Sequence, residues 1–214
     1  MKYKEKLMLK KTEYDDHKKR MRDGFSYHCK NKAKEGQVVF FGDSITEFLC
    51  VSDWYGEYSL ESGLELYNRG IGGDTTLGLY KRAMENVLCI SPGTVVLLIG
   101  TNDLGLGFDT EFIKNNMENI LKLFKSECPG CKVILQAVYP VIDGKAGKRK
   151  NKDILELNKK YKELAGRYGA VFIDLTDKLS DERGNLRSEY TFDGLHLTAQ
   201  GYEATTKEIR KLLA

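Results

Sequence analysis

The residues with the clearest chemical potential are Ser44, His196 and Asp193. A serine hydroxyl is a weak nucleophile until a neighbouring base takes its proton, and a histidine is a good base when an acid orients its ring. Ser44 stands directly after an apolar segment, and Asp193 precedes His196 by three residues. That spacing lets the carboxylate accept from one ring nitrogen while the other faces the serine. The three residues therefore make a candidate nucleophile, base and orienting acid.

Such chemistry also needs hydrogen-bond donors for the negative charge that develops on the attacked carbonyl oxygen. Asn102 offers a side-chain amide after a predicted strand. Gly73 offers a backbone N–H in a glycine-rich segment, and the lack of a side chain permits close approach to that N–H. These two residues are the candidate electrophilic half of the site.

Each of these motifs, taken singly, also fits a structural role. Residues 42–44 could form an ordinary turn whose serine caps a helix, and Gly72 with Gly73 could form only a tight turn. Asn102 could cap a helix, and His196 could be an ordinary structural histidine. Only their combination in one chain favours catalysis.

The elements that must position these residues alternate along the chain. Five short segments that are apolar and rich in β-branched or aromatic residues predict strands at 37–41, 64–67, 94–99, 132–138 and 170–173. Helical patterns predict helices at 74–90, 109–127, 151–168 and 198–213. We therefore predict an α/β fold with a mostly parallel sheet and helices on both faces. The candidate residues follow the carboxyl ends of strands, where sites gather in such sheets.

Length and charge describe the rest of the chain. The 214 residues are 41% hydrophobic and 30% charged, which favours one domain with a full core. The net charge of +3 comes largely from a basic cluster in residues 1–35, predicted to form an extra helix outside a domain at 36–214. We interpret its charges, with His17 and His28, as a solvated surface and expect no nucleic-acid partner. Deletion of residues 1–30 should then spare the chemistry.

Targeting signals and cysteines bear on location. Residues 1–22 contain no apolar stretch behind their basic start, and no segment approaches the roughly 18 apolar residues of a membrane span. Five cysteines fit a reducing compartment better than a disulfide framework. Cys128 and Cys131 lack further zinc ligands nearby and are expected to be free thiols in a turn. We expect a cytoplasmic protein without stable membrane insertion.

Two other classes of function need consideration. A nucleotide-binding domain is suggested by Gly70, Gly72 and Gly73, which follow a predicted strand. The dinucleotide motif needs a glycine where Thr75 stands, and residues 144–148 lack the Walker spacing. A non-catalytic binding protein is the second alternative. The presence together of a candidate nucleophile, base, acid and amide donor argues against it.

Four blocks of sequence carry a resemblance to a known family. Residues 42–44, the Gly73 loop, residues 100–103 and residues 193–196 occur in the order of the four blocks of the SGNH/GDSL hydrolases. The resemblance runs from about residue 37 to the end. Residues 68–76 and 195–198 are especially similar to the catalytic subunits of platelet-activating-factor acetylhydrolase and to bacterial lysophospholipase-like esterases.

The resemblance implies a flavodoxin-like, three-layer α/β/α fold with a five-stranded parallel sheet, and a serine esterase that needs no metal or organic cofactor. It assigns Ser44 as nucleophile, His196 as base and Asp193 as its orienting acid. The Ser44 N–H, the Gly73 N–H and the Asn102 side chain form the implied oxyanion hole. Lysophospholipase or acyltransferase activity on the same fold stays open, as does a homodimer.

The substrate is expected to be a small-molecule ester with a short-chain acyl or O-acetyl group. The sequence has no long apolar lid segment, and the glycine-rich residues 104–107 predict a short, open loop beside the site. Trp54 and Tyr55 are candidate walls of a substrate pocket, although such aromatics more often belong to the core.

Overall fold

The sheet at the centre of the fold is parallel throughout. The computed structural model describes the backbone of residues 3–213 and the side chains of residues 14–213. Its five strands lie in the order β2-β1-β3-β4-β5. They are β1 (Val38–Gly42), β2 (Leu66–Gly70), β3 (Thr94–Leu98), β4 (Lys132–Gln136) and β5 (Val171–Ile173). This is the flavodoxin-like order, so the predicted fold class is confirmed.

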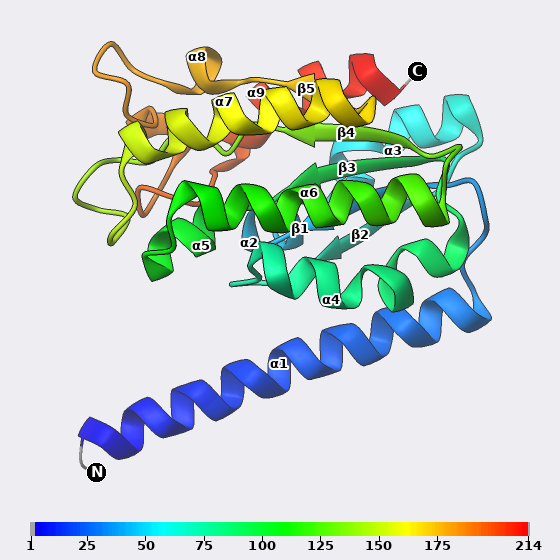
Figure 1. The fold of residues 1–214 in the computed structure, drawn as a ribbon, viewed down its shortest axis with the longest axis horizontal. Helices are drawn as coiled ribbons and strands as arrows, with labels where there is room; N and C mark the ends of the chain where they lie inside the picture. Colours follow the sequence, from blue (N-terminus) through cyan, green and yellow to red (C-terminus); the bar gives the residue numbers. More distant parts are fainter. Residues whose placement is uncertain (1–2, 214) are drawn as a thin grey trace.

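Helices cover both faces of the sheet (Figure 1). Successive strand residues point to opposite faces. Val39 and Phe41 pack with the helices of one face, while Phe40 and Val96 pack with those of the other. The first face carries α4 (Thr76–Asn86), α6 (Thr110–Glu127) and α7 (Asn151–Tyr168), and the second carries α3 (Val51–Ser62) and α9 (Ala199–Leu213). Burial on both faces explains why the strands read as continuous apolar runs.

The helix α6 forms as its sequence predicts. The Asp109 side chain caps it by accepting from the Phe112 N–H at 2.7 Å. Its buried residues recur at helical spacing: Ile113, Met117, Ile120, Leu121 and Phe124. The helix ends at Glu127, just before Cys128 and Pro129.

Several helices are additional to those predicted. They are α2 (Ser44–Glu47), α3, α5 (Thr101–Leu106) and α8 (Thr176–Leu179), with short 3₁₀ turns η1 (Leu88–Ile90) and η2 (Ser188–Tyr190). The helix α3 contains Gly56 and shows little apolar periodicity, because it buries chiefly two tyrosines, Tyr55 and Tyr58. The predicted helix at 74–90 is interrupted after Asn86, where η1 follows.

The N-terminal helix α1 (Tyr3–Asn31) runs along the outside of α4 (Figure 1). The two histidines of this helix are paired rather than freely solvated, which corrects the prediction. His17 contacts Glu47 at 2.8 Å, and Arg69 donates to His28 at 2.9 Å. Side chains before residue 14, including five lysines of the basic cluster, lie outside the described residues.

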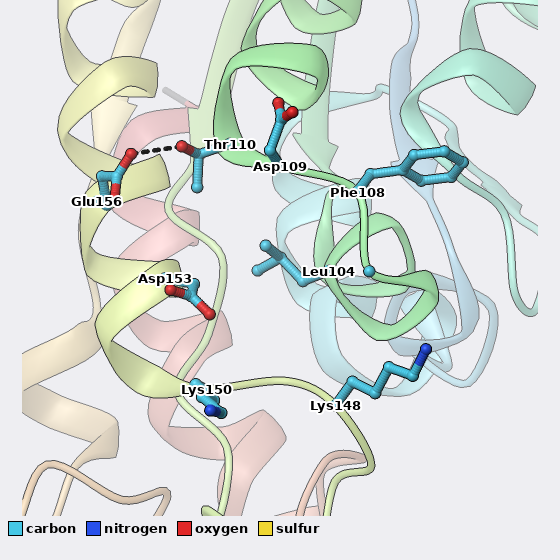
Figure 2. Close-up of a pocket in the computed structure, with 9 residues that line it drawn as sticks. Leu104, Phe108, Asp109, Thr110, Lys148, Lys150, Asp153 and Glu156 are labelled. Carbon is cyan, nitrogen blue, oxygen red and sulfur yellow. Dashed lines mark hydrogen bonds between the residues drawn. The ribbon is translucent and has the colours of Figure 1, made fainter.

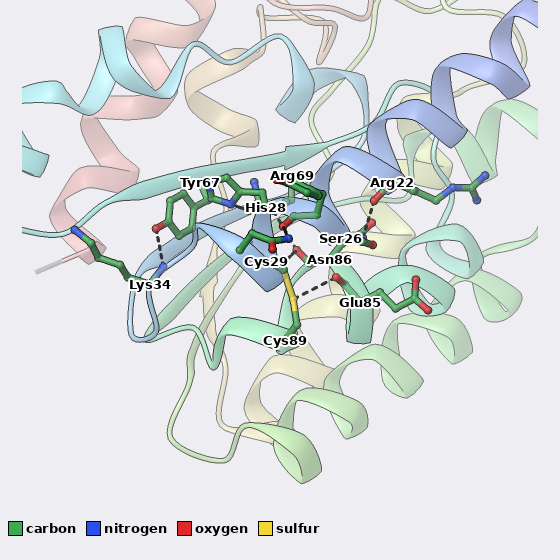
Figure 3. The surroundings of a disulfide bond; sticks show 12 residues. Arg22, Ser26, His28, Cys29, Lys34, Tyr67, Arg69, Glu85, Asn86 and Cys89 are labelled. Atoms are coloured by element: carbon green, nitrogen blue, oxygen red, sulfur yellow. Dashed lines mark hydrogen bonds between the residues drawn. A yellow bond between two sulfur atoms is a disulfide. The ribbon is translucent and has the colours of Figure 1, made fainter.

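A disulfide joins α1 to the core between Cys29 and Cys89 (Figure 3). This bond departs from the expectation that the five cysteines fit a reducing compartment better than a disulfide framework. Cys50, Cys128 and Cys131 are free, as predicted for the last two. In the described part of the chain, no helix combines the length and the apolar character that crossing a membrane would require.

Candidate active site

Ser44 stands at the junction of β1 and α2. The Asp43 carboxylate caps α2 by accepting from the Ile45 N–H at 3.0 Å. Gly42 allows the helix to begin this close to the strands, because a Cβ there would lie 2.2 Å from Thr46 Oγ1 and 2.4 Å from the Leu98 carbonyl oxygen. Ser44 is nearly buried, with 7% of its surface exposed. The serine does not itself cap the helix, so that structural alternative is not what the fold uses.

A continuous hydrogen-bonded chain runs from Ser44 to Asp193. The Ser44 Oγ lies 2.8 Å from His196 Nε2, and His196 Nδ1 lies 2.6 Å from Asp193 Oδ2. An ionised carboxylate only accepts, so Nδ1 carries the proton and Nε2 presents its lone pair to the serine. Hydrogen bonds from the side chain and backbone of His196 lower the pKa of Asp193 even though burial opposes them.

Hydrogen bonds within the loop itself hold the segment that carries His196. Asp193 Oδ1 accepts from the N–H groups of Leu195 and His196 at 2.9 and 2.8 Å. A bridge between Thr191 and Leu197 closes the loop. The carboxylate therefore fixes the turn and the imidazole ring together.

The glycine-rich loop after β2 lies beside the serine. A Cβ on Gly72 would be 3.8 Å from the Ser44 Cβ. Gly73 has a φ of +63°, a left-handed conformation that favours glycine. Within residues 14–213, neither the Gly73 nor the Ser44 backbone N–H has a partner. Both are free to donate to a ligand.

The side chain of Asn102 is fixed by two neighbours. Its Nδ2 donates to the Asp74 carbonyl at 3.0 Å, and its Oδ1 accepts from Arg149 Nη2 at 2.9 Å. Because guanidinium can only donate, the amide has one possible orientation, which leaves one N–H for a ligand. Asn102 makes no cap hydrogen bond to its own helix, α5. We did not predict Arg149, because it lies in a basic run at 148–150 that reads as surface.

Two buried ion and hydrogen-bond networks hold the loops together. Arg82 Nε donates to Asp74 Oδ2 at 2.6 Å, and Arg82 Nη2 donates to the carbonyls of Gly42 and Arg69 at 3.0 and 2.8 Å. It thereby fastens the carboxyl ends of β1 and β2. Beside it, buried Asp103 accepts from the Thr76 hydroxyl at 2.6 Å, which joins α5 to α4.

The buried carboxyl group of Asp43 has a raised pKa. Burial, followed in size by the neighbouring carboxylates Asp74 and Asp103 among the raising effects, raises the pKa of Asp43 to about 7. Its Oδ2 has no hydrogen-bond partner among the described residues. The carboxyl group is therefore only partly ionised at neutral pH.

Two exposed aromatic rings flank the candidate base. Phe48 and Phe192 lie 5.3 and 6.1 Å from His196, measured between ring centroids. Their exposed fractions are 56% and 71%. The sequence pointed instead to Trp54 and Tyr55 as pocket walls. Tyr55 belongs to the core, where it is fully buried against Phe40, and Trp54 is half-buried and packs against the same cluster.

An open cavity of about 640 Å³ lies next to α5 (Figure 2). It extends from Leu104 and Gly107 to the starts of α6 and α7. Its charged lining residues are Asp109, Lys148, Lys150, Asp153 and Glu156. Thr110 donates a hydrogen bond to Glu156 across one side of it. Both charged and apolar side chains therefore line the cavity, and its two lysines flank Arg149 in the chain.

Comparison with known proteins places these features in a family. The model of the GDSL-like lipase/acylhydrolase family matches residues 40–204. The chain is 30% identical to platelet-activating factor acetylhydrolase IB subunit alpha1 of Bos taurus, over 86% of this chain and 77% of that protein.

Solved structures agree with the sequence match. A candidate platelet activating factor from Streptococcus pneumonia is similar over 100% of both chains, with a TM-score of 0.91 and 28% identity. A candidate acylhydrolase from Bacteroides fragilis has a TM-score of 0.76 and 27% identity, covering 88% of this chain and 93% of that one. The resemblance predicted from the four sequence blocks is confirmed, and the chain belongs to the GDSL-like lipase/acylhydrolase family of hydrolases.

Proposed function

We propose that this hydrolase is a serine esterase that cleaves short-chain acyl or O-acetyl esters through Ser44, His196 and Asp193. The observation that carries the proposal is the hydrogen-bonded chain of 2.8 and 2.6 Å that links the three side chains. A hydroxyl in contact with an oriented imidazole is the arrangement that nucleophilic acyl transfer requires.

The reaction proceeds in two steps. Ser44 attacks the ester carbonyl carbon while His196 takes the hydroxyl proton. The N–H groups of Ser44 and Gly73 and the Asn102 amide bind the oxyanion, and the alcohol leaves with a proton from His196. A water molecule, deprotonated by the same histidine, then attacks the acyl-enzyme and releases the acid, which restores the Ser44 hydroxyl.

Two observations support a short acyl group. The Bos taurus relative is named for hydrolysis of an acetyl group. The exposed rings of Phe48 and Phe192 beside His196 offer apolar contacts for an acyl group of a few carbons. The partner in this proposal is a small ester; neither nucleic acid nor membrane insertion is involved, and the proposed location is the cytoplasm.

Replacement of the nucleophile tests the mechanism. Ser44→Ala should lower kcat on p-nitrophenyl acetate by about 10⁴- to 10⁶-fold, because no acyl-enzyme can form. Ser52→Ala is the matched control, since Ser52 is an exposed serine of α3 outside the hydrogen-bonded chain of Ser44, His196 and Asp193. Its kcat should equal that of the wild type, and both melting temperatures should be unchanged. Full turnover by Ser44→Ala would disprove the assignment.

A series of p-nitrophenyl esters tests the substrate class. Acetate and butyrate should give the highest kcat/KM, with a decline toward decanoate and palmitate. Acetylated xylose should be assayed alongside by release of acetate. A maximum at the longest chains would instead favour the lysophospholipase alternative.

A further inference from the structure

The helix α1 contacts the glycine-rich loop of the candidate site directly. Tyr14 and Lys18 lie four residues apart and so share one face of the helix. The Tyr14 hydroxyl donates to the Gly72 carbonyl at 2.6 Å, and Lys18 Nζ donates to the Gly73 carbonyl at 2.8 Å. Both are contacts across more than 50 residues of sequence.

A third contact reaches the same loop through a carboxylate. His17, on the same face, lies 2.8 Å from Glu47 Oε1, and Glu47 Oε2 accepts from the Gly72 N–H at 2.5 Å. The polar backbone groups of Gly72 and the carbonyl of Gly73 are therefore all paired. Of the backbone groups of these two glycines, only the Gly73 N–H lacks a partner among residues 14–213.

Through the geometry of the peptide bond, these contacts also determine the direction of the Gly73 N–H. The Gly72 carbonyl and the Gly73 N–H belong to one planar trans peptide, so they point in opposite directions. Two adjacent glycines have no side chain to prevent this peptide from rotating as a unit. A hydrogen bond on the Gly72 carbonyl therefore also fixes the direction of the Gly73 N–H.

We propose that Tyr14, assisted by Lys18, is a positioning residue that holds the Gly72–Gly73 peptide with its N–H directed at the oxyanion. The inference rests on the proposed function, because Gly73 is an oxyanion donor only in that mechanism. The helix α1 thereby becomes part of the catalytic apparatus, although it touches no reacting atom.

The surroundings of Tyr14 agree with this role. A Cβ on Gly73 would lie 1.2 Å from the Tyr14 hydroxyl oxygen, so the ring end closes directly over the loop. Partial burial, and then the nearby carboxylates led by Asp74, raise the pKa of Tyr14 to about 12. The hydroxyl thus stays protonated, and remains a donor, throughout the pH range of an esterase assay.

The test removes only the hydroxyl. Tyr14→Phe should lower kcat on p-nitrophenyl acetate by about 10- to 100-fold, somewhat less than the loss of a complete oxyanion donor. KM should change less than twofold, because the oxyanion forms only after binding. Tyr27→Phe is the matched control: Tyr27 is an exposed tyrosine of the same helix whose hydroxyl has no partner among the described residues. Lys18→Met should lower kcat, and Lys18→Arg should restore it by keeping a donor.

A second readout separates this inference from the choice of substrate. A fluorophosphonate probe reacts when the Ser44 oxygen bonds to phosphorus, fluoride leaves and the serine proton passes to His196. The reaction uses the oxyanion hole but no carboxylic ester. Tyr14→Phe should lower the labelling rate by about the same factor as it lowers kcat. Its melting temperature should equal that of Tyr27→Phe.

Each outcome decides something. Equal labelling rates for Tyr14→Phe and the wild type would overturn the positioning role, whatever the ester assays show. A wild type that is labelled but hydrolyses no ester would overturn the proposed function, while the labelling comparison would still decide the role of Tyr14. A wild type that is not labelled would overturn both.

Discussion

In the proposed mechanism, the Asn102 amide group stabilises the charge of the oxyanion. Arg149 and the Asp74 carbonyl hold it, and one N–H stays available for the oxyanion. Asn102→Ala should lower kcat by about 10²- to 10³-fold, or roughly 3 to 4 kcal/mol of barrier, with a smaller effect on KM. Asn102→Asp should be worse, because a carboxylate repels the oxyanion.

The measurement is kcat and KM for wild type, Asn102→Ala and Asn102→Asp on p-nitrophenyl acetate, together with melting temperatures. Asn115→Ala provides a control on the exposed face of α6. Unchanged rates with a lowered melting temperature would return Asn102 to a purely structural role.

The raised pKa of Asp43 predicts a pH dependence of stability. Its pKa is about 7 in the folded chain and about 3.9 in a model peptide, so the folded state binds the proton more tightly. The contribution of this difference to the stability of the folded state is full below about pH 4 and is lost as the pH rises through about 7. Asp43→Asn keeps the volume and the helix cap but does not ionise. The variant should therefore be more stable than the wild type at pH 8 and similar to it at pH 4.5.

Urea unfolding of both proteins at pH 4.5, 6 and 8 checks this prediction. The difference in the free energy of unfolding should grow with pH by an amount on the order of a few kcal/mol. A difference that stays constant with pH would show that Asp43 has an ordinary pKa.

The junction of β1 and α2 depends on the absence of a side chain at Gly42. A Cβ there would meet Thr46 Oγ1 at 2.2 Å and the Leu98 carbonyl at 2.4 Å. Gly42→Ala should lower the free energy of unfolding by about 1 to 3 kcal/mol, as overpacking does, and should reduce turnover by displacing Ser44. In contrast, Gly56→Ala in α3 meets nothing within 4 Å and should stabilise by about 0.5 to 1 kcal/mol.

Urea denaturation and ester assays on the two variants provide the comparison. If Gly42→Ala were as stable and as active as Gly56→Ala, the close approach of helix and strand would not matter for the site.

The helix α1 changes the expected role of the N-terminal segment. Every residue first assigned to the chemistry lies after residue 40, which suggests that residues 1–30 are dispensable. Tyr14 and Lys18 bind the carbonyls on either side of the Gly73 N–H, which argues against that expectation. A helix that is remote in sequence thus stabilises a loop of the candidate site.

At the scale of the whole molecule, the bond between Cys29 and Cys89 joins α1 to the core across a sequence separation of 60. Closing a loop of that length stabilises a protein by about 4 kcal/mol in the chain-entropy model. Cys89→Ser should lower the free energy of unfolding by up to about that amount, and dithiothreitol should lower the wild type to the same value. Cys50→Ser, which changes an exposed free thiol, should have almost no effect.

The same cysteines test the proposed location. Protein trapped by acid and alkylation from cells should have Cys29 and Cys89 reduced if it resides in a reducing cytoplasm.

For the stability prediction, equal free energies of unfolding for Cys89→Ser, Cys50→Ser and oxidised wild type would show that the disulfide does not stabilise the fold.

The sequence by itself determined the layered fold and the main candidate residues. Apolar runs and the cap at Asp109 are local signals, and they fixed the strands and the long helices. Alternating strands and helices predict a parallel sheet, and parallel strands bring their carboxyl ends to one edge. Ser44, Gly73 and Asn102 each follow a strand, so they are expected to converge there. The sequence did not predict α3, because its two buried residues, Tyr55 and Tyr58, give no clear helical periodicity of apolar residues.

Only the tertiary structure decided which side chains support those residues. Arg149 and Tyr14 lie 47 and 58 residues from their partners Asn102 and Gly72, and Cys29 lies 60 from Cys89. Tyr55 belongs to the core, whereas Phe48 and Phe192 flank His196. Such contacts depend on how finished elements dock against one another. Periodicity and capping report only interactions within about one helical turn or one strand, so no local pattern in the sequence encodes them.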